Sequence, residues 1–190
     1  GKNRLEALGD VEEAADFIRA DCDTMEAHGG FVRPQGRESD RHRNTSILKP
    51  HGVWGVIAPF NFPVALAGGP SAAAILAGNT VVLKPLLVQC FHDAGIPAGV
   101  INMVTGQKDA GSALVDHPGV DGFTFTGSYK VGMEIYAKVA QGPRPRPVLA
   151  EMGGKNPTII GASADVAMAA EGVMRAAFGL TGQKCSACSR

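Results

Sequence analysis

The sequence lacks several features that are typical of nucleic-acid-binding, secreted, metal-binding and membrane proteins. Its 18 basic and 18 acidic residues cancel over 190 residues, so it carries neither a basic footprint for nucleic acid nor an acidic tail. It has only four cysteines with scattered spacing, which excludes a secreted disulfide framework and favours a reducing compartment. No signal-peptide pattern opens the sequence. We therefore expect a cytoplasmic protein, or one of the mitochondrial matrix if the source is eukaryotic.

Metal ligands and membrane-spanning runs are also scarce. The five histidines are scattered and no second C-x-x-C accompanies residues 185–188, so we predict no metal site. The longest uncharged run, residues 52–83, is long enough to cross a bilayer. However, Pro59, Pro63 and residues 68–70 interrupt it repeatedly, which favours buried strand, loop, helix and strand. We expect neither nucleic acid nor a membrane as partner.

The first periodic stretch predicts an amphipathic helix over residues 10–28. Apolar residues recur there at steps of four and three, which places them on one helical face. They are Val11, Ala15, Ile18, Cys22 and Met25. Asp10 is expected to cap this helix, Gly29 to end it, and Cys22 to lie in the core. Residues 33–43 are charged and turn-rich, so we expect a solvated connection there.

Short apolar runs then alternate with helical segments. The expected buried strands are residues 53–58, 80–84, 100–104, 122–126 and 147–151. The expected helices lie near residues 71–77, 110–116 and 128–140. This alternation predicts an α/β fold with a Rossmann-like parallel sheet and helices on both faces. Such a sheet binds ligands beyond the carboxyl ends of its strands.

Two further segments complete the predicted fold. Residues 86–99 are just long enough for the crossover that a parallel sheet requires between neighbouring strands; the alternative is an internal deletion in this segment. After residue 151 we expect a short strand at residues 158–160 and a helix over residues 164–178. An apolar stripe on that helix delivers the loop that carries Cys185.

The sequence of that loop provides surroundings that suit a reactive cysteine. Cys185 lies among glycines, beside Lys184 and close to Arg190, and neighbouring cations favour the thiolate, which is the nucleophilic form. Three interpretations compete: a buried structural thiol, half of a zinc site or redox pair with Cys188, and a catalytic nucleophile. The residues of this loop alone leave all three open.

Polar residues at the strand ends also have two interpretations each. Asn61, constrained by a proline on either side, is a turn residue or a rigid donor to an oxyanion. Glu151 is a solvated loop acid, or a general base whose apolar neighbourhood suits it to work near neutral pH. The Lys84 side chain, at the end of an apolar strand, extends either to solvent or to a bound ligand. Gly127 and Ser128 begin a helix whose free N–H groups suit an anion, although no G-x-G-x-x-G is present.

Five short motifs together resemble those of the aldehyde dehydrogenase superfamily and follow that family's order. They are PFNFP at residues 59–63, GNTVVLKP at 78–85, FTGS at 125–128, EMGGKNP at 151–157 and GQKC at 182–185. Glu151 and Cys185 stand at the family's usual separation. The residues after Cys185, SACS at 186–189, are most similar to the pyrroline-5-carboxylate (glutamate semialdehyde) dehydrogenase branch. The resemblance runs along nearly the whole chain and covers only the N-terminal part of a family member.

The resemblance implies a reaction and assigns roles to residues. An aldehyde is oxidised to a carboxylic acid through a thiohemiacetal and a thioester on Cys185, with NAD, or NADP, as cofactor. Asn61 and the Cys185 amide form the oxyanion hole, and Glu151 activates water. The implied cofactor-binding residues are Ala58, Phe60, Lys84, Gly127, Ser128 and Met152. Glutamate semialdehyde, an intermediate of proline catabolism, is the favoured substrate; the alternatives are another aliphatic or aromatic aldehyde, or a non-catalytic nucleotide-binding role.

The resemblance also implies a division of the chain. Residues 1–152 would form a coenzyme-binding domain with an N-terminal helical segment. Residues 153–190 would begin the catalytic domain, which is truncated just after the nucleophile loop. The full-length protein is expected to be a homo-oligomer that acts on a small-molecule aldehyde.

Overall fold

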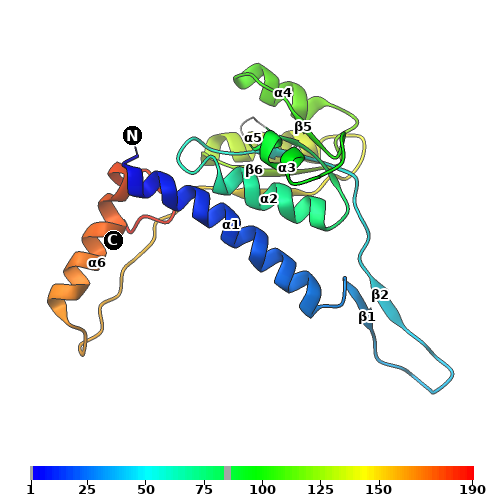
Figure 1. Ribbon diagram of the computed structural model, residues 1–190, viewed down its shortest axis with the longest axis horizontal. Coiled ribbons are helices and arrows are strands. Elements are labelled where there is room, and N and C mark those ends of the chain that lie inside the picture. Colours follow the sequence, from blue (N-terminus) through cyan, green and yellow to red (C-terminus); the bar gives the residue numbers. More distant parts are fainter. Residues whose placement is uncertain (1, 84–86) are drawn as a thin grey trace.

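A five-stranded parallel sheet lies at the centre of the computed structural model, which describes residues 2–83 and 87–190 (Figure 1). In spatial order its strands are β5 (Ile101–Met103), β4 (Thr80–Leu83), β3 (Val53–Ile57), β6 (Gly122–Thr126) and β7 (Val148–Glu151). The chain builds β3, β4 and β5 outward, then returns to the other side of β3 for β6 and β7. The strand order therefore reverses between β3 and β6, the kind of point at which α/β folds bind ligands. The predicted α/β class and parallel sheet are confirmed.

Helices cover both faces of the sheet, and each face has its own apolar core. On one face, α2 (Ala65–Leu76) and α3 (Val88–Asp93) pack over Val56, Val81, Leu83 and Ile101. On the other, α4 (Lys108–Asp116) and α5 (Tyr129–Ala140) enclose Val115, Val120, Phe123, Phe125, Ile135 and Val139. Successive side chains of a strand point to opposite faces, so the central strands supply both cores. The six-residue helix α3 lies within the segment in which a crossover was predicted.

The first helix, α1 (Arg4–Ala27), begins before the predicted start at Asp10. Its cap is Asn3, whose Oδ1 accepts the Glu6 N–H at 2.8 Å while the Glu6 carboxylate accepts the Asn3 N–H at 3.0 Å. This reciprocal arrangement is a capping box. Asp10 is therefore not the cap, and its carboxylate is buried inside the fold.

The face that α1 turns toward α2 also differs from the predicted one. Its buried residues are Asp10 and Ala14, each one position before a member of the predicted stripe, and that stripe is only partly buried. Small residues on α2 determine which face of α1 packs against it. Gly69 leaves room for the Phe17 ring, because a Cβ at position 69 would lie 2.8 Å from that ring. Cys22 is consequently exposed, and its predicted place in the core is wrong.

Two segments in the middle of the chain also contain more regular secondary structure than predicted. α2 starts at Ala65 and runs through Pro70, where the sequence predicted a helix only from about residue 71. At the two ends of the segment expected to be a connection, residues 33–43, β1 (Val32–Pro34) and β2 (Thr45–Ile47) form an antiparallel hairpin that projects from the body (Figure 1). All six residues of this hairpin's strands are exposed, so no alternation of apolar and polar residues signals them.

The region after β7 is less regular than predicted. Residues 158–160, which the structure describes, form no strand, although the Thr158 N–H donates to the Arg190 carbonyl oxygen and a single bridge joins Asn156 and Cys188. The chain then enters α6 (Val166–Phe178), capped by the Asp165 carboxylate. The outer strands β5 and β7 are half exposed and not fully buried, because each lies at an edge of the sheet. No helix in the described part of the chain is long and apolar enough to cross a bilayer.

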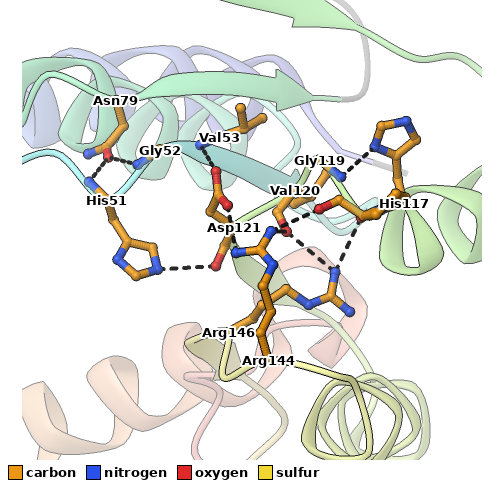
Figure 2. A network of polar contacts seen from close by, with 11 residues as sticks. His51, Gly52, Val53, Asn79, His117, Gly119, Val120, Asp121, Arg144 and Arg146 are labelled. Atoms are coloured by element: carbon orange, nitrogen blue, oxygen red, sulfur yellow. Dashed lines mark hydrogen bonds and ion pairs between the residues drawn. The ribbon is translucent and has the colours of Figure 1, made fainter.

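A polar network fixes the amino ends of β3 and β6 (Figure 2). Asp121 accepts the Val53 N–H at 2.8 Å and pairs with the Arg144 guanidinium at 2.7 Å. Gly52 adopts φ of +132°, and a Cβ there would overlap the Asp121 carboxylate, so the network requires glycine at that position. Because it lies at the opposite end of the strands from the ligand-binding edge, we assign this network to stability.

Replacing Asp121 with asparagine is expected to lower the free energy of unfolding at neutral pH by about 1 kcal/mol, since it removes a partly exposed charge pair and weakens a charge-assisted hydrogen bond. The Val53 N–H, followed by Arg144, holds the pKa of Asp121 below its ordinary 3.8. This contribution is therefore complete above pH 3.8 and is lost as the pH falls through the folded-state pKa.

Urea denaturation of the wild-type protein and the Asp121→Asn variant, at neutral pH and at pH values below 3.8, measures this difference. The matched control is Asp116→Asn, which breaks an exposed pair with Lys138 and should change stability by less than about 0.5 kcal/mol. A difference between wild type and Asp121→Asn that stayed constant into acid would contradict the assignment.

Candidate active site

Predicted cofactor residues line both sides of the switch point. Ala58 and Phe60 follow β3, and Gly127 and Ser128 follow β6. Gly127 donates its N–H to the Glu151 carbonyl oxygen at 3.0 Å, which ties the end of β6 to the end of β7. This edge therefore brings the three strand ends together as the sequence predicted.

The first backbone N–H groups of α5 face this edge of the sheet. Ser128 is the N-cap, and its hydroxyl accepts the Val131 N–H at 3.4 Å. A helix N-terminus favours an anion through its free N–H groups and its dipole. Met152, just after β7, packs against the same helix: a Cβ at Gly132 would lie 2.7 Å from Met152 Sδ. The remaining predicted cofactor residue, Lys84, lies outside the described residues.

Asn61 reaches across the fold to the nucleophile loop. Its Nδ2 donates to the Gln183 carbonyl oxygen at 2.9 Å, and its Oδ1 accepts the Phe62 N–H at 3.1 Å. Both ends of the amide are thus oriented, with the nitrogen facing the loop. A side-chain amide has two N–H donors, so one can hold the loop while the other serves a reacting oxygen. A cavity of about 270 Å³ adjoins this contact, and its lining includes Asn61 and Gln183.

The loop that carries Cys185 is held from its other side by Asn156. The Asn156 amide donates to the Cys185 carbonyl oxygen at 2.7 Å and to that of Ala187 at 3.2 Å. Its own carbonyl oxygen accepts the Ser189 N–H at 3.0 Å. No role was predicted for Asn156, although it is the one amide side chain in the motif at residues 151–157. One residue therefore fixes the backbone from Cys185 to Ser189, while Asn61 holds the backbone before the thiol at Gln183.

The two cysteines of the loop have different surroundings. Cys185 is a free, exposed thiol, and Cys188 is a free, partly buried one. The Cys188 thiol lies 3.6 Å from the Val173 carbonyl oxygen on α6, which it faces as a donor. Among the described residues there is no group of three or more histidine, cysteine or acidic residues arranged to hold a metal ion. These surroundings favour reaction at Cys185 and a packing role for Cys188.

The Glu151 side chain lies at the end of β7 and is exposed. Side chains of this strand alternate between half-buried and exposed because β7 is an edge strand. The apolar surroundings predicted for this carboxylate are therefore not formed within residues 2–83 and 87–190.

A slot between α4 and α5 was not predicted from the sequence. It has a volume of about 510 Å³, within the usual range for ligand pockets. Its apolar lining comes from Ile57, Val115, Val131 and Ile135. Lysines from both helices border it: Lys108, Lys130 and Lys138. An apolar slot beside a helix N-terminus and cations suits a flat base joined to a phosphate.

Comparisons with known proteins agree with this arrangement. Residues 1–190 match the aldehyde dehydrogenase family. A 1-pyrroline-5-carboxylate dehydrogenase of Anoxybacillus flavithermus is 40% identical over 205 residues, which cover 100% of this chain and 39% of the relative. The structure of the 1-pyrroline-5-carboxylate dehydrogenase from Thermus with bound NAD superposes with a TM-score of 0.87 at 38% identity, covering 100% of this chain and 39% of that one.

A larger protein also contains the same unit. Proline utilization A from Bdellovibrio bacteriovorus superposes with a TM-score of 0.87 at 40% identity, over 100% of this chain and 21% of that protein. The chain thus spans about two fifths of the length of the dehydrogenases to which it is similar and a smaller share of the larger protein.

Proposed function

The chain belongs to the aldehyde dehydrogenase family, and from this premise we propose that the protein oxidises an aldehyde to a carboxylic acid with Cys185 as nucleophile. The observation that carries the proposal is the 2.9 Å hydrogen bond from Asn61 Nδ2 to the Gln183 carbonyl oxygen. It holds a rigid amide donor two residues from the thiol. One such donor to a developing oxyanion contributes on the order of 3 kcal/mol to catalysis.

The first half of the reaction takes place at Cys185. The thiolate sulfur attacks the aldehyde carbon, and the carbonyl electron pair moves to oxygen to give a tetrahedral oxyanion. Asn61 Nδ2 and the Cys185 N–H donate to that oxygen. Collapse of the adduct with loss of hydride leaves a thioester on the sulfur, and NAD, when bound, supplies the acceptor for that hydride.

The second half releases the acid. Glu151 takes a proton from water, and the hydroxide formed attacks the thioester carbon. The carbon–sulfur bond breaks, which frees the carboxylic acid and restores the thiolate. The exposure of Glu151 supports this role, because a base for hydrolysis must meet both solvent and the acyl group.

The residues present fit a dinucleotide. The apolar walls of the α4–α5 slot suit the adenine ring, and the first N–H groups of α5, which follow Gly127 and the N-cap Ser128, suit the phosphates. Ala58, Phe60 and Met152 lie at the same edge of the sheet. We propose NAD as the cofactor, as in the Thermus structure, with NADP as the alternative.

For the substrate we propose glutamate semialdehyde. Its support is the identity of 40% to a protein named 1-pyrroline-5-carboxylate dehydrogenase and the similarity to proline utilization A. The alternatives are another aliphatic or aromatic aldehyde, and a non-catalytic role in nucleotide binding.

One experiment separates these possibilities. The purified full-length protein is given NAD with glutamate semialdehyde, an unbranched aliphatic aldehyde or benzaldehyde, and NADH and the carboxylate product are measured. We expect the highest kcat/KM with glutamate semialdehyde. A higher value with another aldehyde would change the substrate, and NAD binding without any turnover would favour the non-catalytic alternative.

The α4–α5 slot provides a test of the cofactor site that does not depend on turnover. Gly111 lines the slot, and a Cβ there would meet nothing within 4 Å, so Gly111→Phe is expected to fill it. The dissociation constant for NAD should rise at least about tenfold, the equivalent of about 1.4 kcal/mol. Isothermal titration calorimetry measures it directly.

The matched control is Ala113→Phe, which adds the same ring to an exposed position of α4 outside the slot. It should leave NAD affinity within about twofold of wild type. Equal dissociation constants for NAD in the two variants would mean that the adenine ring binds outside the α4–α5 slot.

We also propose the division into a coenzyme-binding domain at residues 1–152 and the beginning of a catalytic domain at residues 153–190. The end of the sheet at Glu151 supports it, since α6 and the nucleophile loop follow outside the sheet. A homo-oligomer for the full-length protein stays a prediction.

A further inference from the structure

The turn that precedes the nucleophile has an unusual backbone. Leu180 and Thr181 adopt left-handed conformations with φ of 51° and 54°, and Gly182 follows with φ of 73°. Residues with a Cβ disfavour this region. Two of them in succession persist only where their surroundings fix them, and such residues cluster at functional sites. Cys185 follows three residues later, so its position depends on what holds this turn.

A carboxylate from the first turn of α1 holds it. Glu6 Oε1 accepts the N–H of the buried Leu180 at 2.7 Å, and Glu6 Oε2 accepts the Asn3 N–H at 3.0 Å. Both oxygens are thus engaged, which fixes the carboxylate in one orientation. The two amides, and then the Lys184 charge, hold the pKa of Glu6 below its ordinary 4.5, so the group is ionised at neutral pH. Figure 1 shows the start of α1 beside the end of α6.

The same helix also holds the segment that carries the oxyanion donor. Asp10 lies one turn after Glu6 and accepts the N–H groups of Ala65 at 2.9 Å and Val64 at 3.4 Å, at the start of α2. Asn61 lies just before that start. Lys2 pairs with Asp10 at 2.5 Å and lies over the Phe62 ring at 4.5 Å. Two acidic side chains one helical turn apart therefore hold the two segments whose relative position defines the site.

We propose that Glu6 is a positioning residue that fixes the Leu180 turn, and with it Cys185, relative to the Asn61 amide. This rests on the proposed function for its effect on turnover. Misplacement of a reacting group by about 1 Å costs on the order of 100-fold in rate. Loss of the Glu6 contact therefore lowers kcat and leaves the cofactor slot, which lies on other elements, unaffected.

The test compares three variants of the full-length protein. Glu6→Ala removes both acceptors, Glu6→Gln keeps one acceptor oxygen for the Leu180 N–H, and Asn3→Ala disrupts the capping box without touching Leu180. For each, kcat, KM for the aldehyde and Kd for NAD are measured. Hydrogen–deuterium exchange of the peptide that contains Leu180 is followed by mass spectrometry.

We expect Glu6→Ala to lower kcat by about 10- to 100-fold and to speed exchange of the Leu180 amide at least about tenfold, with an unchanged Kd for NAD. Glu6→Gln should stay within about fivefold of wild type in kcat, and Asn3→Ala within about twofold. Wild-type kcat and exchange in Glu6→Ala would overturn the proposal. So would an equal loss in Asn3→Ala, which would assign the effect to helix capping.

The exchange measurement also separates the two proposals. If Glu6→Ala speeds Leu180 exchange but the wild-type protein oxidises no aldehyde, the contact stands and the proposed function fails. If the wild type is active and exchange does not respond, Glu6 has no positioning role and the proposed function stands.

Discussion

Replacement of Cys185 by alanine is expected to abolish aldehyde oxidation, with kcat lowered by about 10⁴-fold or more, because no other group can form the covalent adduct. The thiol is exposed, so its removal leaves no cavity in a core. The loop should keep its shape, since Asn156 bonds to the Cys185 carbonyl oxygen and not to the side chain. NAD affinity, measured by calorimetry, should therefore match that of the wild type.

The matched control is Cys188→Ala, three residues away. This partly buried thiol faces the Val173 carbonyl oxygen, and its loss should reduce kcat by no more than about threefold, the effect of a weak packing contact. Equal losses of activity in the two variants would contradict the single nucleophile and favour a pair of thiols that act together.

Replacement of Glu151 by glutamine is expected to separate the two halves of the reaction. Glutamine keeps the size and hydrogen bonding of the side chain but cannot take a proton from water near pH 7. The thioester on Cys185 should form and then persist. Rapid mixing with aldehyde and NAD should give a burst of NADH close to one equivalent per active site, followed by turnover about 10²- to 10⁴-fold slower than wild type.

Mass spectrometry of the peptide that contains Cys185 should detect the acyl adduct. Glu171→Gln serves as control, because this exposed glutamate pairs with Arg175 on α6, and its steady-state rate should be unchanged. A Glu151→Gln variant without a burst would mean that the carboxylate activates the thiol. Full steady-state activity would leave the base for hydrolysis unidentified.

Local patterns predicted the sheet well because each strand carries its own signal. The strand at Gly122–Thr126 has the predicted bounds, and three others differ by one residue at one or both ends. The predicted end of β4, Lys84, lies outside the described residues. Periodicity was less accurate on α1, where Val11 and Cys22 of the predicted apolar stripe are exposed and the other three members are only half-buried. The contact face of that helix is chosen by Gly69 on α2, and no pattern within α1 records where its partner's small residues lie.

The contacts within the candidate active site could not be predicted for a different reason. Motifs identified Asn61 and Cys185 as separate features, and family resemblance assigned their roles. The contact between Asn61 and Gln183 spans 122 residues of sequence, so no local rule predicts it. No role was predicted for Asn156 or Glu6, because only the fold brings each of them against a backbone group near Cys185.

The bond between Glu6 and the Leu180 amide has a consequence for how the protein assembles during synthesis. Its partners are 174 residues apart, and the whole sheet lies between them in the sequence. At roughly 5–20 residues per second, the ribosome delivers Leu180 roughly 10–30 s after Glu6. The helix and the sheet therefore form first, and the reactive cysteine acquires its final geometry among the last events. A nascent chain thus carries an unpositioned thiol until the scaffold that directs its chemistry is complete.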